Sequence, residues 1–121
     1  MKQADRRTES RRRIIEAAQE RGLTYGGHVP TRVGLERALA AGYRHIEHLT
    51  GYGAILAGGD GAFFWQSIDE SRIPELVQAT VTAGTWNCPT LAIFDRFTQG
   101  DPIPRANRQL VVRALFEGGA P

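Results

Sequence analysis

The chain has 121 residues, which is enough for one small domain with a hydrophobic core and too few for two. Its formal net charge is only +2, and a single cysteine, Cys88, excludes an internal disulfide and is typical of a reducing compartment. No apolar run is long enough to cross a bilayer. We therefore expect a soluble, cytoplasmic chain without a membrane partner, while an export signal on a longer parent chain stays an open alternative.

The cationic charge gathers in one N-terminal cluster: Arg6, Arg7, Arg11, Arg12 and Arg13. Acidic residues are interleaved with these arginines, and no aromatic residue occurs before Tyr25. Nucleic-acid-binding segments instead combine unpaired basic residues with aromatic ones. We therefore expect no nucleic-acid partner and interpret the cluster as the solvated face of a helix.

Hydrophobic periodicity predicts helices and strands in alternation: helix 8–21, strand 23–29, helix 32–41, strand 43–49, helix 69–83, strand 85–94 with a bend at Pro89, and helix 105–117. The first helix should bury a narrow stripe: Ile14, Ile15, Ala17 and Ala18. Residues 50–65 and 95–104 are predicted to be loops, the first rich in glycine and aromatic residues.

This alternation predicts an α/β fold with a parallel sheet. Three consecutive strand-helix units fit either half of a doubly wound sheet or a partial (β/α)8 TIM-barrel arc. The long loops follow the strands and the returns to the strands are short, as in a barrel. No dinucleotide or phosphate-binding glycine motif favours the open sheet. We therefore expect a single partial barrel domain over residues 1–121.

Two of the three histidines, His28 and His48, each end a predicted strand, with one predicted helix between them. The helix rises roughly 15 Å, and the following strand returns by roughly 16 Å. A right-handed crossover of this kind places the second strand beside the first. We therefore expect the two imidazoles to be neighbours at one edge of the sheet, an arrangement that indicates a metal site.

Side chains alternate along the second strand, which puts His48 on the side of Ile46 and puts His45 and Glu47 on the other. If His48 points into a barrel, His45 and Glu47 face the surrounding helices. Glu47 is then either a hydrogen-bond acceptor that orients a ligand histidine or a partner of local backbone groups. A histidine taken alone is more often a structural group than a metal ligand, and it is the pairing of His28 with His48 that brings the ligand interpretation level with the structural one.

The sequence carries three motifs in order: Gly-Gly-His28-Val-Pro, Leu39-Ala-Ala-Gly-Tyr-Arg-His-Ile-Glu-His48-Leu-Thr-Gly-Tyr, and Pro89-Thr-Leu. Together they resemble the amidohydrolase superfamily, in the region related to imidazolonepropionase and prolidase-like members, and the similarity spans residues 22–121. The resemblance implies a metal-dependent (β/α)8 barrel in which histidines at the ends of the fifth and sixth strands are metal ligands. His28 and His48 occupy those positions.

The resemblance also implies residues that this sequence lacks: a His-x-His pair on the first strand and an aspartate on the eighth. Lys2 lies one residue short of the spacing from His28 expected of a metal-bridging lysine, and otherwise it is an exposed terminal lysine. The implied protein is a fragment covering barrel units four or five to seven, inactive by itself. A barrel cut in this way exposes sheet edges, so we expect marginal stability and self-association.

For the complete enzyme, the resemblance implies hydrolysis of a C–N bond in a small amide, lactam or dipeptide-like substrate, assisted by one or two divalent ions such as zinc. Tyr52 is a candidate substrate contact or a packing residue. Trp65, with Phe63 and Phe64, either lines an apolar pocket or anchors its loop. Two alternatives stay open: a non-catalytic α/β interaction or scaffold unit with structural histidines, and a small enzyme that uses His48 and Glu47 as an acid/base pair.

Overall fold

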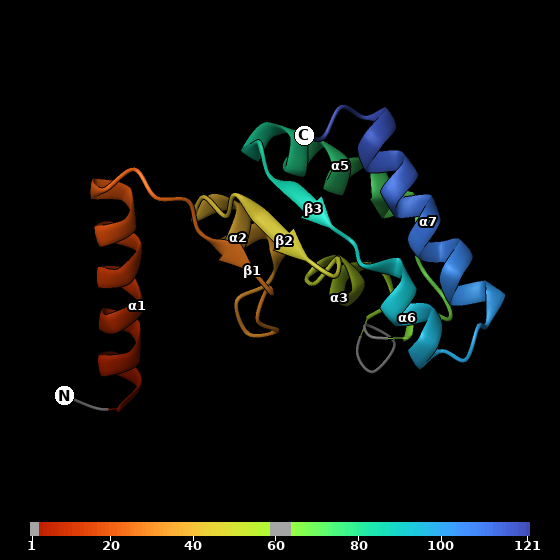
Figure 1. The fold of residues 1–121 in the computed structure, drawn as a ribbon, viewed down its shortest axis with the longest axis horizontal. Helices are drawn as coiled ribbons and strands as arrows, with labels where there is room; N and C mark the ends of the chain where they lie inside the picture. The colour runs from red at the N-terminus through yellow and green to blue at the C-terminus, as the bar shows by residue number, and fades with distance from the viewer. Residues whose placement is uncertain (1–2, 59–63) are drawn as a thin grey trace.

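The computed structural model describes residues 3–58 and 64–121. Its elements follow one another in the order α1 (Gln3–Glu20), β1 (Gly26–Gly27), α2 (Leu35–Ala40), β2 (His45–Glu47), α3 (Tyr52–Leu56), η1 (Glu70–Arg72), α5 (Ile73–Ala83), β3 (Trp86–Cys88), α6 (Leu91–Phe97) and α7 (Pro102–Glu117). The three strands form one sheet in the order β1-β2-β3, and both pairs are parallel (Figure 1). The predicted α/β fold with a parallel sheet is confirmed.

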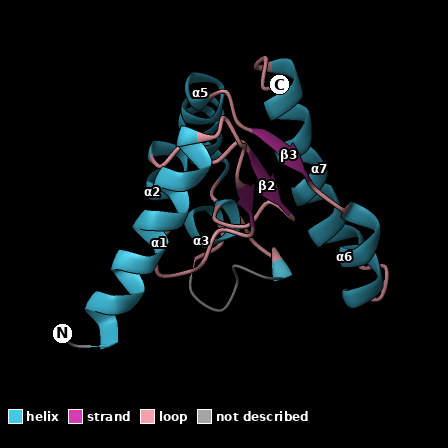
Figure 2. Ribbon diagram, turned by 60° about the vertical axis from the view of Figure 1, so that its left-hand side comes forward, coloured by secondary structure: helices cyan, strands magenta, loops and turns pink. Residues whose placement is uncertain are grey.

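The helices bury one face of this sheet. Ile46, the central residue of β2, is 0% exposed and belongs to a single core shared with α2, α3, α5 and α7. The residues of that core are Val29, Leu35, Ala38, Leu39, Ile46, Leu49, Tyr52, Leu56, Trp65, Ile73, Leu76, Val111 and Leu115. Helix α7 also packs against α5 and α6, and Figure 2 shows the strands lying among these helices.

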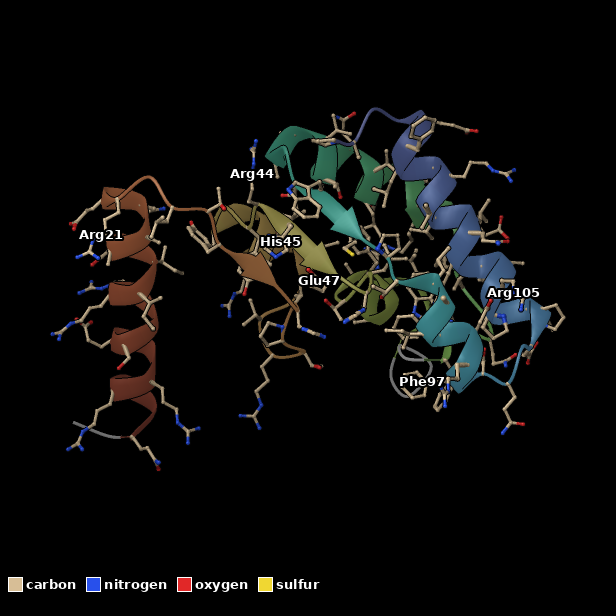
Figure 3. The ribbon with its side chains drawn as sticks, viewed as in Figure 1. Arg21, Arg44, His45, Glu47, Phe97 and Arg105 are labelled. Carbon is tan, nitrogen blue, oxygen red and sulfur yellow. The ribbon has the colours of Figure 1, made fainter. Side chains whose placement is uncertain are left out.

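The opposite face of the sheet carries no comparable apolar layer within the described residues. His45 stacks on Trp86 with ring centroids 4.9 Å apart, and Trp86 is 41% exposed. The His45 imidazole also lies 3.6 Å from the Glu47 carboxylate, measured from Nε2 to Oε1 (Figure 3). The expectation that His45 and Glu47 face the helices was therefore wrong, because Ile46 occupies that side of the strand.

A glycine lets the His45 ring lie flat over this face. Gly26 of β1 pairs with His45 in the parallel ladder. A Cβ atom at Gly26 would lie 2.7 Å from the ring nitrogen Nδ1 and 2.3 Å from the backbone oxygen of His45. Both distances are shorter than a Cβ contact can be, so any other residue at this position would clash with His45. Gly26 is therefore a position where the two backbones approach too closely for any side chain.

Helix α5 ends at Ala83 as predicted, but it begins at Ile73, because the first part of the predicted helix 69–83 forms the 3-10 helix η1. Pro74 stands in its first turn, where the missing amide hydrogen costs nothing. Gly84 ends it in the left-handed conformation, with φ of 66°, and its amide donates to carbonyls of the last turn. Buried Leu76 and Thr80 form the inner face of α5.

Helix α1 departs from expectation. It is longer than predicted and lies apart from the rest of the molecule, joined by an extended segment (Figure 1). Ile14 is 68% exposed, so the predicted stripe is not buried at this position. Its described ion pairs are intrahelical, among them Arg12 and Arg13 with Glu9. Such pairs stabilise a solvated helix by only a few tenths of a kcal/mol, roughly 0.2–0.5 each.

Two predicted boundaries were also wrong. Residues 91–94 belong to helix α6 rather than to a strand, because Pro89 has no amide hydrogen to continue the ladder and Thr90 turns the chain with φ of 49°. Within the predicted loop 50–65, residues Tyr52–Leu56 form the short helix α3. Among the described residues, no helix is long and apolar enough to span a membrane.

Candidate functional site

The carboxyl ends of the three strands bring together the residues that follow them. His28 comes directly after β1, His48 directly after β2, and Thr90 two residues after β3. Because the strands are parallel and adjacent, these three residues meet at one edge of the sheet. In open and closed parallel sheets alike, this edge is where ligands bind.

The two imidazoles are in contact. The ring centroids of His28 and His48 are 4.6 Å apart, and the ring planes are tilted by 53°. The crossover through α2 therefore produces the neighbouring rings that the element lengths predict. His28 is exposed and His48 is half-buried, so the pair opens to solvent on the side of His28.

Neighbouring elements fix the position of His48. Its backbone amide donates to the Cys88 carbonyl at 2.8 Å, which extends the β2–β3 ladder by one residue. Its ring nitrogen Nδ1 is hydrogen-bonded to the Thr90 hydroxyl, and its ring meets the edge of Phe94 with centroids 5.9 Å apart. With Nδ1 engaged by Thr90, Nε2 is the nitrogen that can bind a metal or exchange a proton.

The backbone at this edge is strained. His48, Leu49 and Thr90 have φ of 60°, 54° and 49°. Trp65, which lines the same region, has φ of 58°. Residues with a side chain rarely adopt these values, and such strain clusters at binding sites because the surrounding structure must hold it. Four of the five such residues described in the chain lie at this edge, the fifth being Gln99.

A cavity of about 320 Å³ opens beside the imidazoles. Its described lining is mostly apolar and comes from the segments after β1 and β2, from α3, and from Trp65 and Phe94. The lining residues are His28, Val29, Pro30, Thr31, Gly34, His48, Leu49, Thr50, Gly51, Gly53, Ala54, Trp65 and Phe94.

A buried arginine supports the aromatic wall of this cavity. Arg108 of α7 is 2% exposed, and its guanidinium carbon lies 4.2 Å from the ring centroid of Phe94 and 5.3 Å from that of Trp65. Loss of solvation lowers the pKa of Arg108 to about 10, partly offset by the charge of Asp95. Asn107 holds the same wall by donating from Nδ2 to the Trp65 carbonyl at 2.7 Å.

Sequence reasoning missed both Thr90 and Arg108 as site residues. Thr90 was noticed only within the motif Pro89-Thr-Leu, with no contact assigned to it. Arg108 carries no signal in the sequence, because an arginine within an amphipathic helix ordinarily points to solvent. Only the packing of α7 against α6 turns it inward.

No family model matches the chain, and neither does any curated protein or solved structure with which it was compared. Among the described residues, no group of three or more His, Cys, Asp and Glu side chains could hold a metal ion together.

The remaining predicted site residues lie in different places. Tyr52 is 0% exposed, and its hydroxyl contacts the Thr80 hydroxyl at 2.7 Å and accepts from Asn87 Nδ2 at 3.2 Å. Burial raises the pKa of the Tyr52 phenol, against the opposing effect of these two hydrogen bonds. This placement gives no support to a substrate contact by Tyr52 and identifies it as a core residue.

Trp65 lines the cavity and is 2% exposed. Phe64 is 51% exposed, while Phe63 lies outside the described residues, and so does Lys2. Glu47 lies beside His45 rather than beside His48, which does not favour an acid/base pair of Glu47 and His48.

The two imidazoles fit part of a zinc site. Histidine nitrogen is a preferred zinc donor, and a ligand histidine ordinarily engages its second nitrogen in a hydrogen bond, as His48 does with Thr90. Catalytic zinc sites use three protein ligands. His28 and His48 supply two, so a complete centre of this kind needs at least one ligand more.

Proposed function

We propose that this chain provides two metal ligands, His28 and His48, of a metal-dependent hydrolase of the amidohydrolase type. The reaction would be hydrolysis of a C–N bond in a small amide, lactam or dipeptide-like substrate. The observation that carries the proposal is the pair of imidazoles in contact at the carboxyl edge of adjacent parallel strands. The motif resemblance supplies the reaction class, and at least one further protein ligand is required.

The proposal includes a partial (β/α)8 barrel. Support comes from the uneven covering of the sheet, whose helix-facing side is buried at Ile46 while Trp86 on the other side is 41% exposed. In a closed barrel, that second side faces the interior and is covered by the opposite strands. Among the described residues, the outer edges of β1 and β3 have no neighbouring strand, and in such a barrel they would pair with further strands.

Within such a centre, the chain's own residues have distinct tasks. A bound divalent ion would supply Lewis acidity toward a carbonyl and a water molecule. His28 and His48 would hold it through imidazole nitrogen. Thr90 fixes the ring orientation and tautomer of His48 through Nδ1, and Phe94 closes one side of that ring against water.

The competing proposal is a non-catalytic α/β interaction or scaffold unit in which the histidines are structural. It is favoured by the absence of a third metal-binding side chain near the pair among the residues that the structure describes. The ring contact and the Thr90 hydrogen bond would then serve only to join the three strand ends. The two proposals differ in whether the pair takes up metal.

Zinc titration by calorimetry separates these proposals. We expect weak binding by the wild type, because two ligands are present, and a loss of affinity of about tenfold or more in the His28→Ala, His48→Ala double variant. His45→Ala is the matched control, since His45 lies on the other face of the sheet against Trp86. Circular dichroism would verify that each variant folds. Equally weak uptake by the wild type and the double variant would contradict the metal-centre proposal.

A further inference from the structure

We infer that the cavity beside His28 and His48 binds an uncharged apolar group, such as an aromatic ring, with the polar part of the ligand directed at the imidazoles. This inference deepens the proposed function and rests on it for the identity of the polar part as an amide. The apolar specificity itself is carried by the cavity wall.

The wall combines a few polar groups with a larger apolar surface. His28, His48 and two threonines provide the polar groups, whereas six side chains provide apolar surface: Val29, Pro30, Leu49, Ala54, Trp65 and Phe94. None of the described lining residues is Asp, Glu, Lys or Arg. A charged ligand group placed against the apolar surface would lose its hydration without gaining a counter-charge, which is strongly unfavourable.

The cavity is large enough for a ring and an amide together. Its volume is about 320 Å³, and apolar cavities of roughly 150 Å³ already bind benzene. The remaining volume is sufficient for a carboxamide, which we place against the imidazoles. Ligand sites of this general kind, mostly apolar with a few convergent polar groups, start at a volume of roughly 300 Å³.

The aromatic wall is held in place before any ligand arrives. The Arg108 guanidinium lies over both rings, and Asn107 binds the Trp65 carbonyl. Arg108 is not among the residues that line the cavity, so its guanidinium contacts the two rings and would not contact the ligand directly. A wall fixed in this way reduces the entropy lost when a ring packs against it.

Fluorescence titration of the full chain tests the specificity directly. The variant Trp86→Phe leaves Trp65 as the single tryptophan, and Trp86 lies on the far face of the sheet from the core. Benzamide should change the Trp65 emission saturably. The anionic analogue 4-carbamoylbenzoate should bind at least about tenfold more weakly, because its carboxylate has no partner on the apolar surface. Equal affinity for the two compounds, or no saturable response to benzamide, would overturn the inference.

A carboxylate placed in the cavity wall should weaken the binding of a neutral ligand and strengthen the binding of a cationic one. Ala54 is exposed at the cavity rim on α3, so Ala54→Asp adds a carboxylate there without filling the core. We expect this variant to bind benzamide several-fold more weakly and the cation benzamidine about fivefold more tightly than the parent. Ala92→Asp is the matched control, because Ala92 is exposed on α6 outside the cavity lining. The same changes in Ala92→Asp would overturn the inference.

These measurements are separable from the metal titration. The benzamide series is run with a chelator present, so it reports on the wall alone. Benzamide binding without zinc uptake by the histidine pair would overturn the proposed function and leave the apolar site intact. Zinc uptake without benzamide binding would overturn the apolar site and leave the proposed function intact.

Discussion

His48 owes its position to residues of β3 and α6 as much as to the strand that precedes it. Its amide continues the ladder to Cys88, and its ring is bound by Thr90 and bordered by Phe94. These contacts come from sequence positions 40 or more residues further along the chain. The orientation of the ring therefore depends on the segment that contains β3 and α6.

The Tyr52 hydroxyl has a structural role. The phenol is fully buried and forms hydrogen bonds with Thr80 and Asn87. Replacement by phenylalanine removes both hydrogen bonds and leaves the Asn87 amide without its partner, so we expect Tyr52→Phe to lower the free energy of unfolding by about 1–3 kcal/mol. Urea denaturation at neutral pH measures this loss.

The same variant makes a prediction about alkaline pH. Burial raises the pKa of Tyr52 in the folded protein above its unfolded value of about 10. The stabilising contribution of the neutral phenol is therefore complete below pH ~10 and is lost as the pH rises toward the folded-state pKa. The stability difference between the wild type and Tyr52→Phe should shrink above pH ~10. A difference that stays constant through this range would contradict the prediction.

At the scale of elements, helix α1 shows what the spacing of apolar residues can and cannot predict. The spacing of its apolar residues predicts a helix, and the helix forms. Whether its apolar stripe is buried depends on a partner surface that the sequence of the helix itself does not specify. Within the described structure Ile14 finds none and stays 68% exposed.

This exposure gives Ile14→Ala a small expected effect. The free energy of unfolding should change by less than about 0.5 kcal/mol, as for other surface substitutions. Ile46→Ala is the matched comparison: Ile46 is 0% exposed, and its truncation should cost about 2–5 kcal/mol. Chemical denaturation of both variants checks the contrast. A loss above ~2 kcal/mol for Ile14→Ala would mean that α1 packs its stripe in solution.

The alternation of the three strands with α2, α5 and α7, and the meeting of His28 with His48, could be predicted from the sequence, because they depend on element lengths and on the handedness of a crossover. The helical state of residues 91–97 could not. The run Leu-Ala-Ile-Phe is compatible with a buried strand and with a helix face, and the choice is made by the turn at Thr90 and the packing of Phe94. The role of Arg108 likewise arises only from the contact of α7 with α6.

At the scale of the whole molecule, the sheet is short and covered unevenly. Both outer strands are brief, with β1 only two residues long, and Trp86 on β3 is 41% exposed. Several other large apolar side chains are also exposed, including Leu23 at 60% and Phe97 at 60%. Exposed apolar side chains promote association between molecules. Sheet edges that have no neighbouring strand, such as the outer edges of β1 and β3 among the described residues, promote it as well.

We therefore expect the isolated chain to self-associate, with a sedimentation coefficient that rises with protein concentration. Trp86→Lys should shift the association to concentrations about tenfold higher, because an edge lysine opposes strand pairing between copies. Trp86→Phe keeps the apolar surface and is the control. A monomer at all concentrations, with a sharp unfolding transition independent of concentration, would contradict this prediction.

The left-handed backbone at His48 lowers the stability of the fold, while the histidine provides an imidazole that a ligand can use. A glycine would occupy this conformation without strain, whereas a histidine bears a cost of about 1–3 kcal/mol. On backbone grounds alone, the chain would be more stable with glycine in place of His48. If the ring serves a ligand, position 48 is a place where the protein gives up stability for function, and variants selected only for thermal resistance would tend to lose this histidine.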